Sequence, residues 1–197
     1  MKLVRVALAG EGGQGVQSVA EIMAEAAYHE GKEAIYIPNF GLEQRGGVSI
    51  AFIQISDRRI GAPKFSKADI VVALSRRAMT RTHTYSGPET IFVYDSSFQL
   101  KDGDLPSQCK RALDIPAIEK SKELHTRVFN IIIMGAILSL TDMVAVEAAR
   151  MALVKRLGYK FEKNPELKEL NFKAIEVGAE LVQKQSEGGE KVCAATK

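Results

Sequence analysis

The sequence contains no tryptophan, two cysteines and three histidines among its 197 residues. Cys109 and Cys193 lie far apart and match no metal-binding or redox spacing, so no iron–sulfur or zinc motif is present. We interpret both cysteines as structural filler in a reducing compartment, without a disulfide framework. His29, His83 and His125 have no nucleophile motif beside them, and we expect each to be solvated or to cap a helix.

Long apolar runs and blocks of basic charge are also missing. The most apolar stretch, residues 128–140, is too short to span a bilayer, which argues against a membrane protein. The N-terminus shows no signal-peptide pattern, so we expect a cytoplasmic protein. The net charge is only +3 and no basic block occurs, which argues against nucleic acid as a partner.

The composition is that of an ordinary globular domain, with 46% hydrophobic and 26% charged residues. The length suits one domain with a real core. We expect a single domain over residues 1–185 and a polar tail over 186–197.

A glycine-rich turn near the N-terminus organises the chain. Residues 3–9 predict a buried strand, residues 14–28 predict a helix, and Gly10-Glu11-Gly12-Gly13-Gln14-Gly15 joins them. Gly10, Gly12 and Gly15 match the G-x-G-x-x-G spacing: the first permits a sharp turn, the second leaves room for an anion, and the third lets helix and strand pack closely. Such a turn presents helix N–H groups to a phosphate. A plain strand-to-helix turn is the alternative.

Strands and helices alternate through the first half of the chain. We expect strands at 33–37, ended by Pro38, at 48–56, 68–74 and 90–94, and weakly at 109–113. A short partner strand around Ile60 would make an antiparallel hairpin over 48–60. Helices are expected at 76–81, capped by Ser75, and at 128–140, 144–157 and 165–184. The fold class is α/β, a Rossmann-like open and mainly parallel sheet with an antiparallel hairpin and C-terminal helices.

A second polar, glycine-rich loop covers residues 39–47. Gly41, Gly46 and Gly47 bracket Glu43 and Arg45. The guanidinium of Arg45 suits phosphate or carboxylate, and Glu43 could orient it. Turn-forming glycines with a solvent ion pair are the alternative.

Both glycine loops, together with Asp95-Ser96-Ser97, follow strands of the expected sheet. Ligands of open parallel sheets bind outside the carboxyl ends of the strands. We therefore expect the two glycine loops to lie side by side along one rim, with Gly10–Gly15 closing a strand–helix junction and Arg45 presenting its charge.

The end of the second expected strand argues against a standard NAD site. An acid is expected there, about 20 residues beyond the glycines, to hold the ribose hydroxyls. This chain has Ile37-Pro38-Asn39 instead. An anion-friendly loop pair with little chemistry of its own suits a subunit that completes a site formed elsewhere.

The two loops also carry a family resemblance. G-x-G-G-Q-G at residues 10–15 and G-x-E-x-R-G-G at residues 41–47 are matched at every defined position, and the chain resembles the gamma subunit of 2-oxoacid:ferredoxin oxidoreductases. The likeness extends roughly over residues 4–184. Further similarities are Ser66-Lys67-Ala68-Asp69, Asn130 with Gly135, and Asn171 with Gly178.

The resemblance implies an enzyme that oxidatively decarboxylates a 2-oxoacid with coenzyme A, or runs in reverse. Alpha and beta subunits would hold thiamine diphosphate and Mg²⁺, and [4Fe-4S] clusters would lie in beta and in a ferredoxin-like delta subunit; ferredoxin accepts the electrons. This chain would hold no metal and no catalytic residue. Its loops would face coenzyme A or the partner subunits through these residues: Gly10, Gly12, Gly13, Gln14, Gly15, Glu43, Arg45, Gly46 and Gly47.

Two other functions stay open. The chain could be a free-standing nucleotide-dependent reductase, or a module that binds a nucleotide or acyl-CoA without chemistry. A subunit needs a docking surface, which we expect on the apolar helices over residues 128–157.

Overall fold

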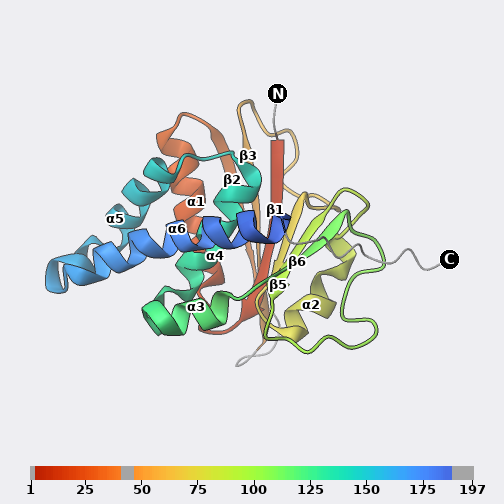
Figure 1. Cartoon of the computed structure of the whole chain (residues 1–197). Helices are drawn as coiled ribbons and strands as arrows, with labels where there is room; N and C mark the ends of the chain where they lie inside the picture. Colours follow the sequence, from red (N-terminus) through yellow and green to blue (C-terminus); the bar gives the residue numbers. More distant parts are fainter. Residues whose placement is uncertain (1–2, 41–46, 188–197) are drawn as a thin grey trace.

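The structure is a computed structural model that describes residues 3–40 and 47–187. A twisted six-stranded sheet runs through the middle of the molecule, with helices on both faces (Figure 1). The elements in chain order are β1 (Leu3–Glu11), α1 (Val16–His29), β2 (Glu33–Asn39), β3 (Val48–Ser56), β4 (Ile70–Ala73), α2 (Arg76–Thr82), η1 (His83–Tyr85), β5 (Ile91–Asp95), β6 (Arg111–Ile115), α3 (Ala117–Leu124), η2 (Thr126–Val128), α4 (Phe129–Thr141), α5 (Val146–Lys163) and α6 (Glu166–Glu187).

The strand order is β2-β3-β1-β4-β5-β6. β1, β4, β5 and β6 are mutually parallel, whereas β3 is antiparallel to both β1 and β2. The expected α/β fold with an open, mainly parallel sheet and one antiparallel hairpin is confirmed.

The hairpin has a different partner from the one expected. No strand forms around Ile60, and β3 pairs with β2 instead. β1 pairs with β3 along its whole length, and β2 pairs with Ile50–Ser56 on the other side, so little of either edge of β3 remains for a further strand. The expectation that Pro38 ends the second strand is also wrong, because β2 continues through Asn39 at the edge of the sheet, where proline is tolerated.

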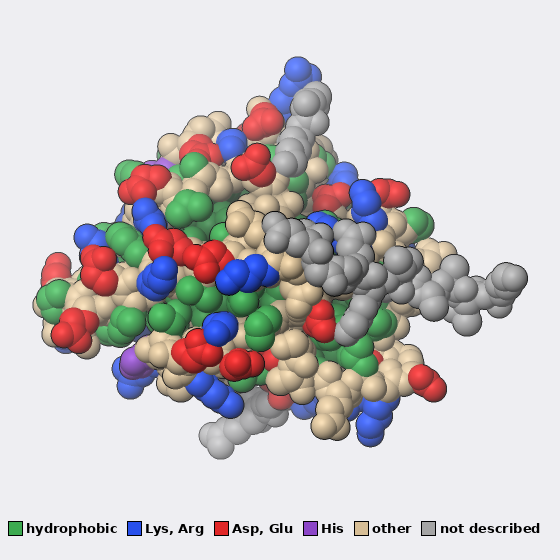
Figure 2. Space-filling view, viewed as in Figure 1, with side chains coloured by type: hydrophobic (Ala, Val, Ile, Leu, Met, Phe, Trp, Pro, Cys, Tyr) green, Lys and Arg blue, Asp and Glu red, His purple; other side chains and the backbone are tan. Residues whose placement is uncertain are grey.

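The two faces of the sheet are covered unequally. α1, α3, α4, α5 and α6 pack over one face, while α2 and irregular segments cover the other (Figure 1). On the surface shown in Figure 2, acidic and basic side chains alternate over α5 and α6, so no broad patch of one sign forms there.

α4 is the interior helix of the thicker layer. Its residues from Ile131 to Leu138 are all buried, and it packs along α6. Gly135 and Gly178 lie where the two helices cross, and a Cβ at either would overlap a carbonyl oxygen of the opposite helix. The prediction of a docking surface over 128–157 is therefore wrong for α4, because α6 covers its apolar residues.

Cys109 also differs from expectation. It is buried and disulfide-bonded, so its interpretation as unpaired filler is wrong. The sequence holds one other cysteine, Cys193, which lies outside the described residues.

The C-terminal helix is longer than expected. α6 extends to Glu187, two residues into the expected tail. In the part of the chain that the structure describes, no helix combines the length and apolarity needed to cross a membrane.

Candidate functional site

The carboxyl ends of the parallel strands form one rim of the sheet. Glu11, at the end of β1, lies opposite Val48, the first residue of β3, and Ala9 lies beside Ala73 of β4. The turn over residues 10–15 therefore adjoins Gly47, which precedes β3. The described ends of the two glycine loops share this rim, as expected, while Gly41, Glu43, Arg45 and Gly46 lie outside the described residues.

The sharp part of the first turn comes later than the motif suggests. Gly10 is still inside β1, paired with Ser49. Gly13 and Gly15 have φ of 91° and 76°, left-handed conformations that favour glycine. The expectation that Gly10 makes the sharp turn is therefore wrong, because the chain reverses at Gly13 and Gly15.

Gln14 holds this turn to the neighbouring strand. Its side-chain Oε1 accepts a hydrogen bond from the Glu11 N–H at 2.7 Å, and its Nε2 donates to the Leu74 carbonyl at 2.8 Å. A Cβ on Gly10 would lie 2.7 Å from that Oε1. Glycine at position 10 thus makes room for Gln14, and Gln14 fixes the loop against the end of β4.

Gly15 has a different neighbour from the one expected. A Cβ there would lie 2.9 Å from the Cβ and Cγ of Asn130, in the first turn of α4. The third glycine therefore permits close approach of α1 to α4 rather than to a strand. It brings two helix N-termini together, each with the partial positive charge of a helix dipole.

The middle of the turn is open. A Cβ on Gly12 or Gly13 would meet nothing within 4 Å, and both residues are exposed. The α1 N-cap, Gly15, has no side-chain capping bond. An anion could therefore approach the backbone at Gly12 and Gly13 without displacing a side chain, which is how a phosphate binds at a helix N-terminus.

The third candidate loop, at the end of β5, is held in the fold. Asp95 is buried, and its carboxylate accepts hydrogen bonds from the N–H groups of Ser97, at 3.0 Å, and Ile118, at 2.8 Å. The second bond caps the start of α3. The carboxylate thus shapes the rim instead of offering a ligand group.

The histidines contact groups of the protein itself. His125 caps η2, in line with the expectation, by accepting the Arg127 N–H at 3.1 Å. His29 contacts Glu25 at 3.2 Å, and His83 contacts the Asp104 carbonyl at 2.9 Å. Among the described residues, no group of three or more His, Cys, Asp or Glu side chains is arranged to hold a metal ion.

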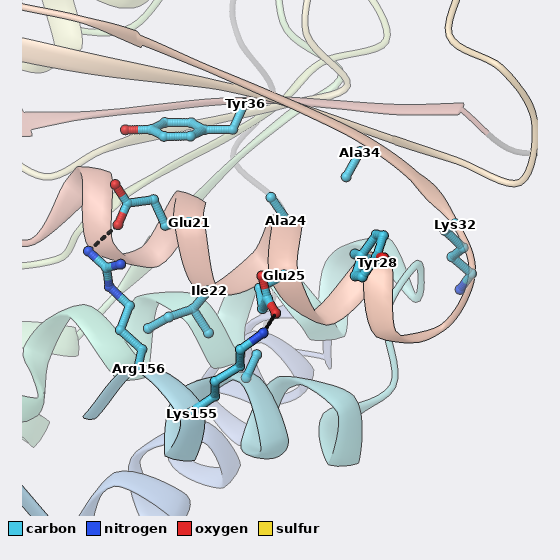
Figure 3. Close-up of a pocket in the computed structure, with 11 residues that line it drawn as sticks. Glu21, Ile22, Ala24, Glu25, Tyr28, Lys32, Ala34, Tyr36, Lys155 and Arg156 are labelled. Carbon is cyan, nitrogen blue, oxygen red and sulfur yellow. Dashed lines mark hydrogen bonds and ion pairs between the residues drawn. The ribbon is translucent and has the colours of Figure 1, made fainter. Parts of the chain in front are cut away.

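Two cavities beside the edge strand β2 were not predicted from the sequence. One, of about 570 Å³, lies between β2, α1 and α5 (Figure 3), and the other, of about 400 Å³, lies on the opposite face. Neither includes the glycine turn. Burial, aided by the nearby charge of Glu21, raises the pKa of Tyr36 in the first cavity. No pattern in the sequence marks these cavities, because only the strand order shows that β2 lies at the edge of the sheet.

A family model described as pyruvate ferredoxin/flavodoxin oxidoreductase matches residues 5–181. The 2-oxoglutarate synthase subunit KorC of Archaeoglobus fulgidus is 32% identical over 90% of this chain and 87% of its own length. The ketoisovalerate oxidoreductase subunit VorA of Methanothermobacter thermautotrophicus is 31% identical over 94% of this chain. The chain spans only 38% of the length of that relative.

Solved structures share the fold. The gamma subunit of a keto/oxoacid ferredoxin oxidoreductase from Geobacter sulfurreducens has a TM-score of 0.76 and 27% identity, covering 97% of this chain and 100% of its own. A 2-oxoglutarate:ferredoxin oxidoreductase from Magnetococcus marinus, solved with 2-oxoglutarate, coenzyme A and succinyl-CoA bound, has a TM-score of 0.82 and 24% identity. That match covers 93% of this chain and 32% of the Magnetococcus chain.

Proposed function

The chain belongs to the pyruvate ferredoxin/flavodoxin oxidoreductase family, and on that premise we propose that it acts as the gamma subunit of a multi-subunit 2-oxoacid:ferredoxin oxidoreductase. The assembled enzyme would convert a 2-oxoacid and coenzyme A into acyl-CoA, CO₂ and reduced ferredoxin. Its relatives carry the names of oxidoreductase and synthase subunits, which supports this assignment.

In this proposal the partner subunits carry the cofactors. Alpha, beta and delta subunits would hold thiamine diphosphate, Mg²⁺ and the [4Fe-4S] clusters. The chain itself would form the coenzyme A side of the site.

The open glycine turn is the observation that carries the proposal. Gly12 and Gly13 are exposed and place no side chain over the turn beside the N-termini of α1 and α4, so their backbone N–H groups suit a phosphate of coenzyme A. Gly10, Gln14 and Gly15 hold the turn in place. Glu43, Arg45, Gly46 and Gly47 of the adjoining loop complete the proposed set, with Arg45 supplying charge.

A free-standing NAD-linked reductase is not favoured by the strand order. In a dinucleotide fold the second strand lies beside the first and brings its acid to the ribose. Here β3 separates β2 from β1, and β2 ends in Asn39. The comparisons also favour the oxidoreductase subunit over this alternative.

Gly12→Ala tests the coenzyme A role in the assembled enzyme. The added methyl fits without a clash in the free chain, but it lies where the phosphate would approach. We expect the KM for coenzyme A to rise about tenfold, equivalent to about 1.4 kcal/mol, with Tm unchanged. Gly61→Ala, another glycine whose Cβ meets nothing, is the control and should leave this KM unchanged.

Two outcomes would contradict the proposal. An unchanged KM for coenzyme A in the Gly12→Ala enzyme would remove the phosphate role of the turn. Absence of coenzyme A-dependent 2-oxoacid oxidation, when the chain is combined with its proposed partner subunits, would remove the function itself.

A further inference from the structure

The edge of the sheet at β2 is open. β2 is the terminal strand and pairs only with β3 in the part of the chain that is described. Its central residues, Ala34 to Ile37, are all partly exposed. An edge strand with unpaired backbone groups is a template for a strand from another chain.

The hydrogen bonds of β1 show which way the β2 backbone groups point. Arg5 and Ala9 give their carbonyl oxygens to the N–H groups of Asp69 and Leu74, on the β4 side. The direction of the backbone N–H and C=O groups alternates from residue to residue along a strand, so those of Val6 point to β3. The backbone groups of its antiparallel partner Ile53 point back to β1.

The same alternation continues across β3 to the edge. Tyr36 lies opposite Ile53, and because Ile53 is directed to β1, the backbone groups of Tyr36 point away from the sheet. Ala34 and Pro38, two residues away on either side, point the same way. The free edge therefore offers the N–H and C=O of Ala34 and Tyr36 and the C=O of Pro38. The outward position of Pro38 also explains why a residue without an N–H is accepted there.

The first cavity flanks this edge on the helical face. Ala34 and Tyr36 line it, together with two buried apolar residues, Ile22 of α1 and Ala152 of α5. Figure 3 shows the charged groups around it in pairs, Glu21 with Arg156 and Glu25 with Lys155. The cavity is thus apolar at its base with its ion pairs already satisfied within the chain, which suits an apolar side chain.

The second cavity flanks the same edge on the opposite face. It is lined by Ile37 and by aromatic rings, with Phe52 packed edge-on against Phe65 at 5.5 Å and Tyr85 at 4.9 Å between centroids. Phe40, which also lines this cavity, is 67% exposed. Side chains of an added strand would alternate between the two faces, so successive residues would reach the two cavities in turn.

We propose that β2 accepts an extended segment of a partner polypeptide as a seventh strand, with large apolar side chains alternating into the two cavities. Backbone hydrogen bonds to Ala34, Tyr36 and Pro38 would give affinity, and the cavities would give specificity. The inference rests on the proposed function and names the docking edge of that subunit.

The relatives indicate what the partner is. The match covers 87% of the length of the KorC relative. It covers only 38% of the length of VorA, so VorA continues well beyond the matched part. The matched part is thus joined to further polypeptide in VorA and makes up most of KorC, which is the reason for seeking the partner in that further polypeptide. We commit to the polypeptide of the same organism that aligns with the rest of VorA as the source of the added strand.

Ala34→Pro tests the edge in the complex co-expressed with that polypeptide. Proline at 34 removes an outward N–H but no hydrogen bond to β3, so Tm should change little. We expect the partner to bind at least tenfold more weakly. Ala34→Ser keeps the N–H and a small side chain, and should bind as the wild type does. Hydrogen exchange of the Ala34 and Tyr36 amides should slow at least tenfold in the wild-type complex.

The outcomes separate this inference from the proposed function. An active complex whose affinity is the same with Ala34→Pro, and whose β2 amides exchange unchanged, overturns the strand addition and leaves the function standing. Protection of β2 through self-association of this chain, with the partner bound elsewhere, overturns it too. Failure of the wild-type chain to form any complex overturns the proposed function together with the inference.

Discussion

The crossing of α4 and α6 makes a strong prediction, because two backbones meet there without a side chain between them. A Cβ on Gly135 would overlap the carbonyl oxygen of Ile175, and a Cβ on Gly178 would overlap that of Ile132. Backbone atoms inside a helix cannot rotate away as a side chain can. Gly135→Ala must therefore push the two helices apart in the thicker layer of the core.

Two opposing effects set the change in the free energy of unfolding caused by Gly135→Ala. Overpacking a core costs about 1–3 kcal/mol, and the upper end applies because the obstacle is backbone. Replacing a helical glycine by alanine returns about 1 kcal/mol. The net loss is about 2 kcal/mol, which for a domain of this size lowers Tm by about 4–8 °C.

Thermal unfolding followed by circular dichroism measures this change. Gly158 lies in the interior of α5, where a Cβ meets nothing. Gly158→Ala therefore measures the gain in helix propensity without a clash, and should raise Tm by about 2–4 °C. The reasoning would be refuted if Gly135→Ala were as stable as the wild type while Gly158→Ala behaved as expected.

Two further predictions concern the rim and the end of α1. Gln14→Ala removes two hydrogen bonds that hold the glycine turn, so we expect a loss of about 2 kcal/mol and a raised KM for coenzyme A; unchanged values of both would show that the turn holds itself. Glu30 accepts the Ala145 N–H at 2.8 Å and pairs with Lys32, and although burial opposes this, its pKa is lowered. Its stabilising contribution is present above the unfolded-state pKa and is lost as pH falls through the lowered value. Glu30→Gln should therefore unfold more readily than the wild type near neutral pH, with the difference closing below about pH 4; a gap in urea midpoint that persists at pH 3 would contradict it.

Local order was accessible from the sequence because it depends on short-range chemistry. Ser75 was expected to cap a helix, and its hydroxyl accepts the Ala78 N–H at 3.2 Å. Gly31, just after the end of α1 at His29, has φ of 71°, a left-handed conformation in which glycine commonly ends a helix. The strand–turn–helix unit at the N-terminus and the three long C-terminal helices were recognised for the same reason, since hydrophobic periodicity reports local conformation.

The candidate site was only partly accessible. Glycine positions located the turn, but their roles depended on distant residues: Leu74 for Gln14, and Asn130 for Gly15. Neither partner is near the turn in the chain. The motif therefore located the residues of the turn without showing what each one contacts.

What the sequence by itself determined is most of the strands, the long helices, the α/β class, the glycine-rich turn and the family likeness, because propensity, periodicity and motif spacing are properties of neighbouring residues. Only the tertiary structure decided that β3 lies between β1 and β2, that α6 covers the apolar α4, and that β2 is left at an open edge between two cavities. Strand order and helix packing depend on which distant surfaces fit together, and that competition among long-range pairings leaves no trace in any short stretch of the chain.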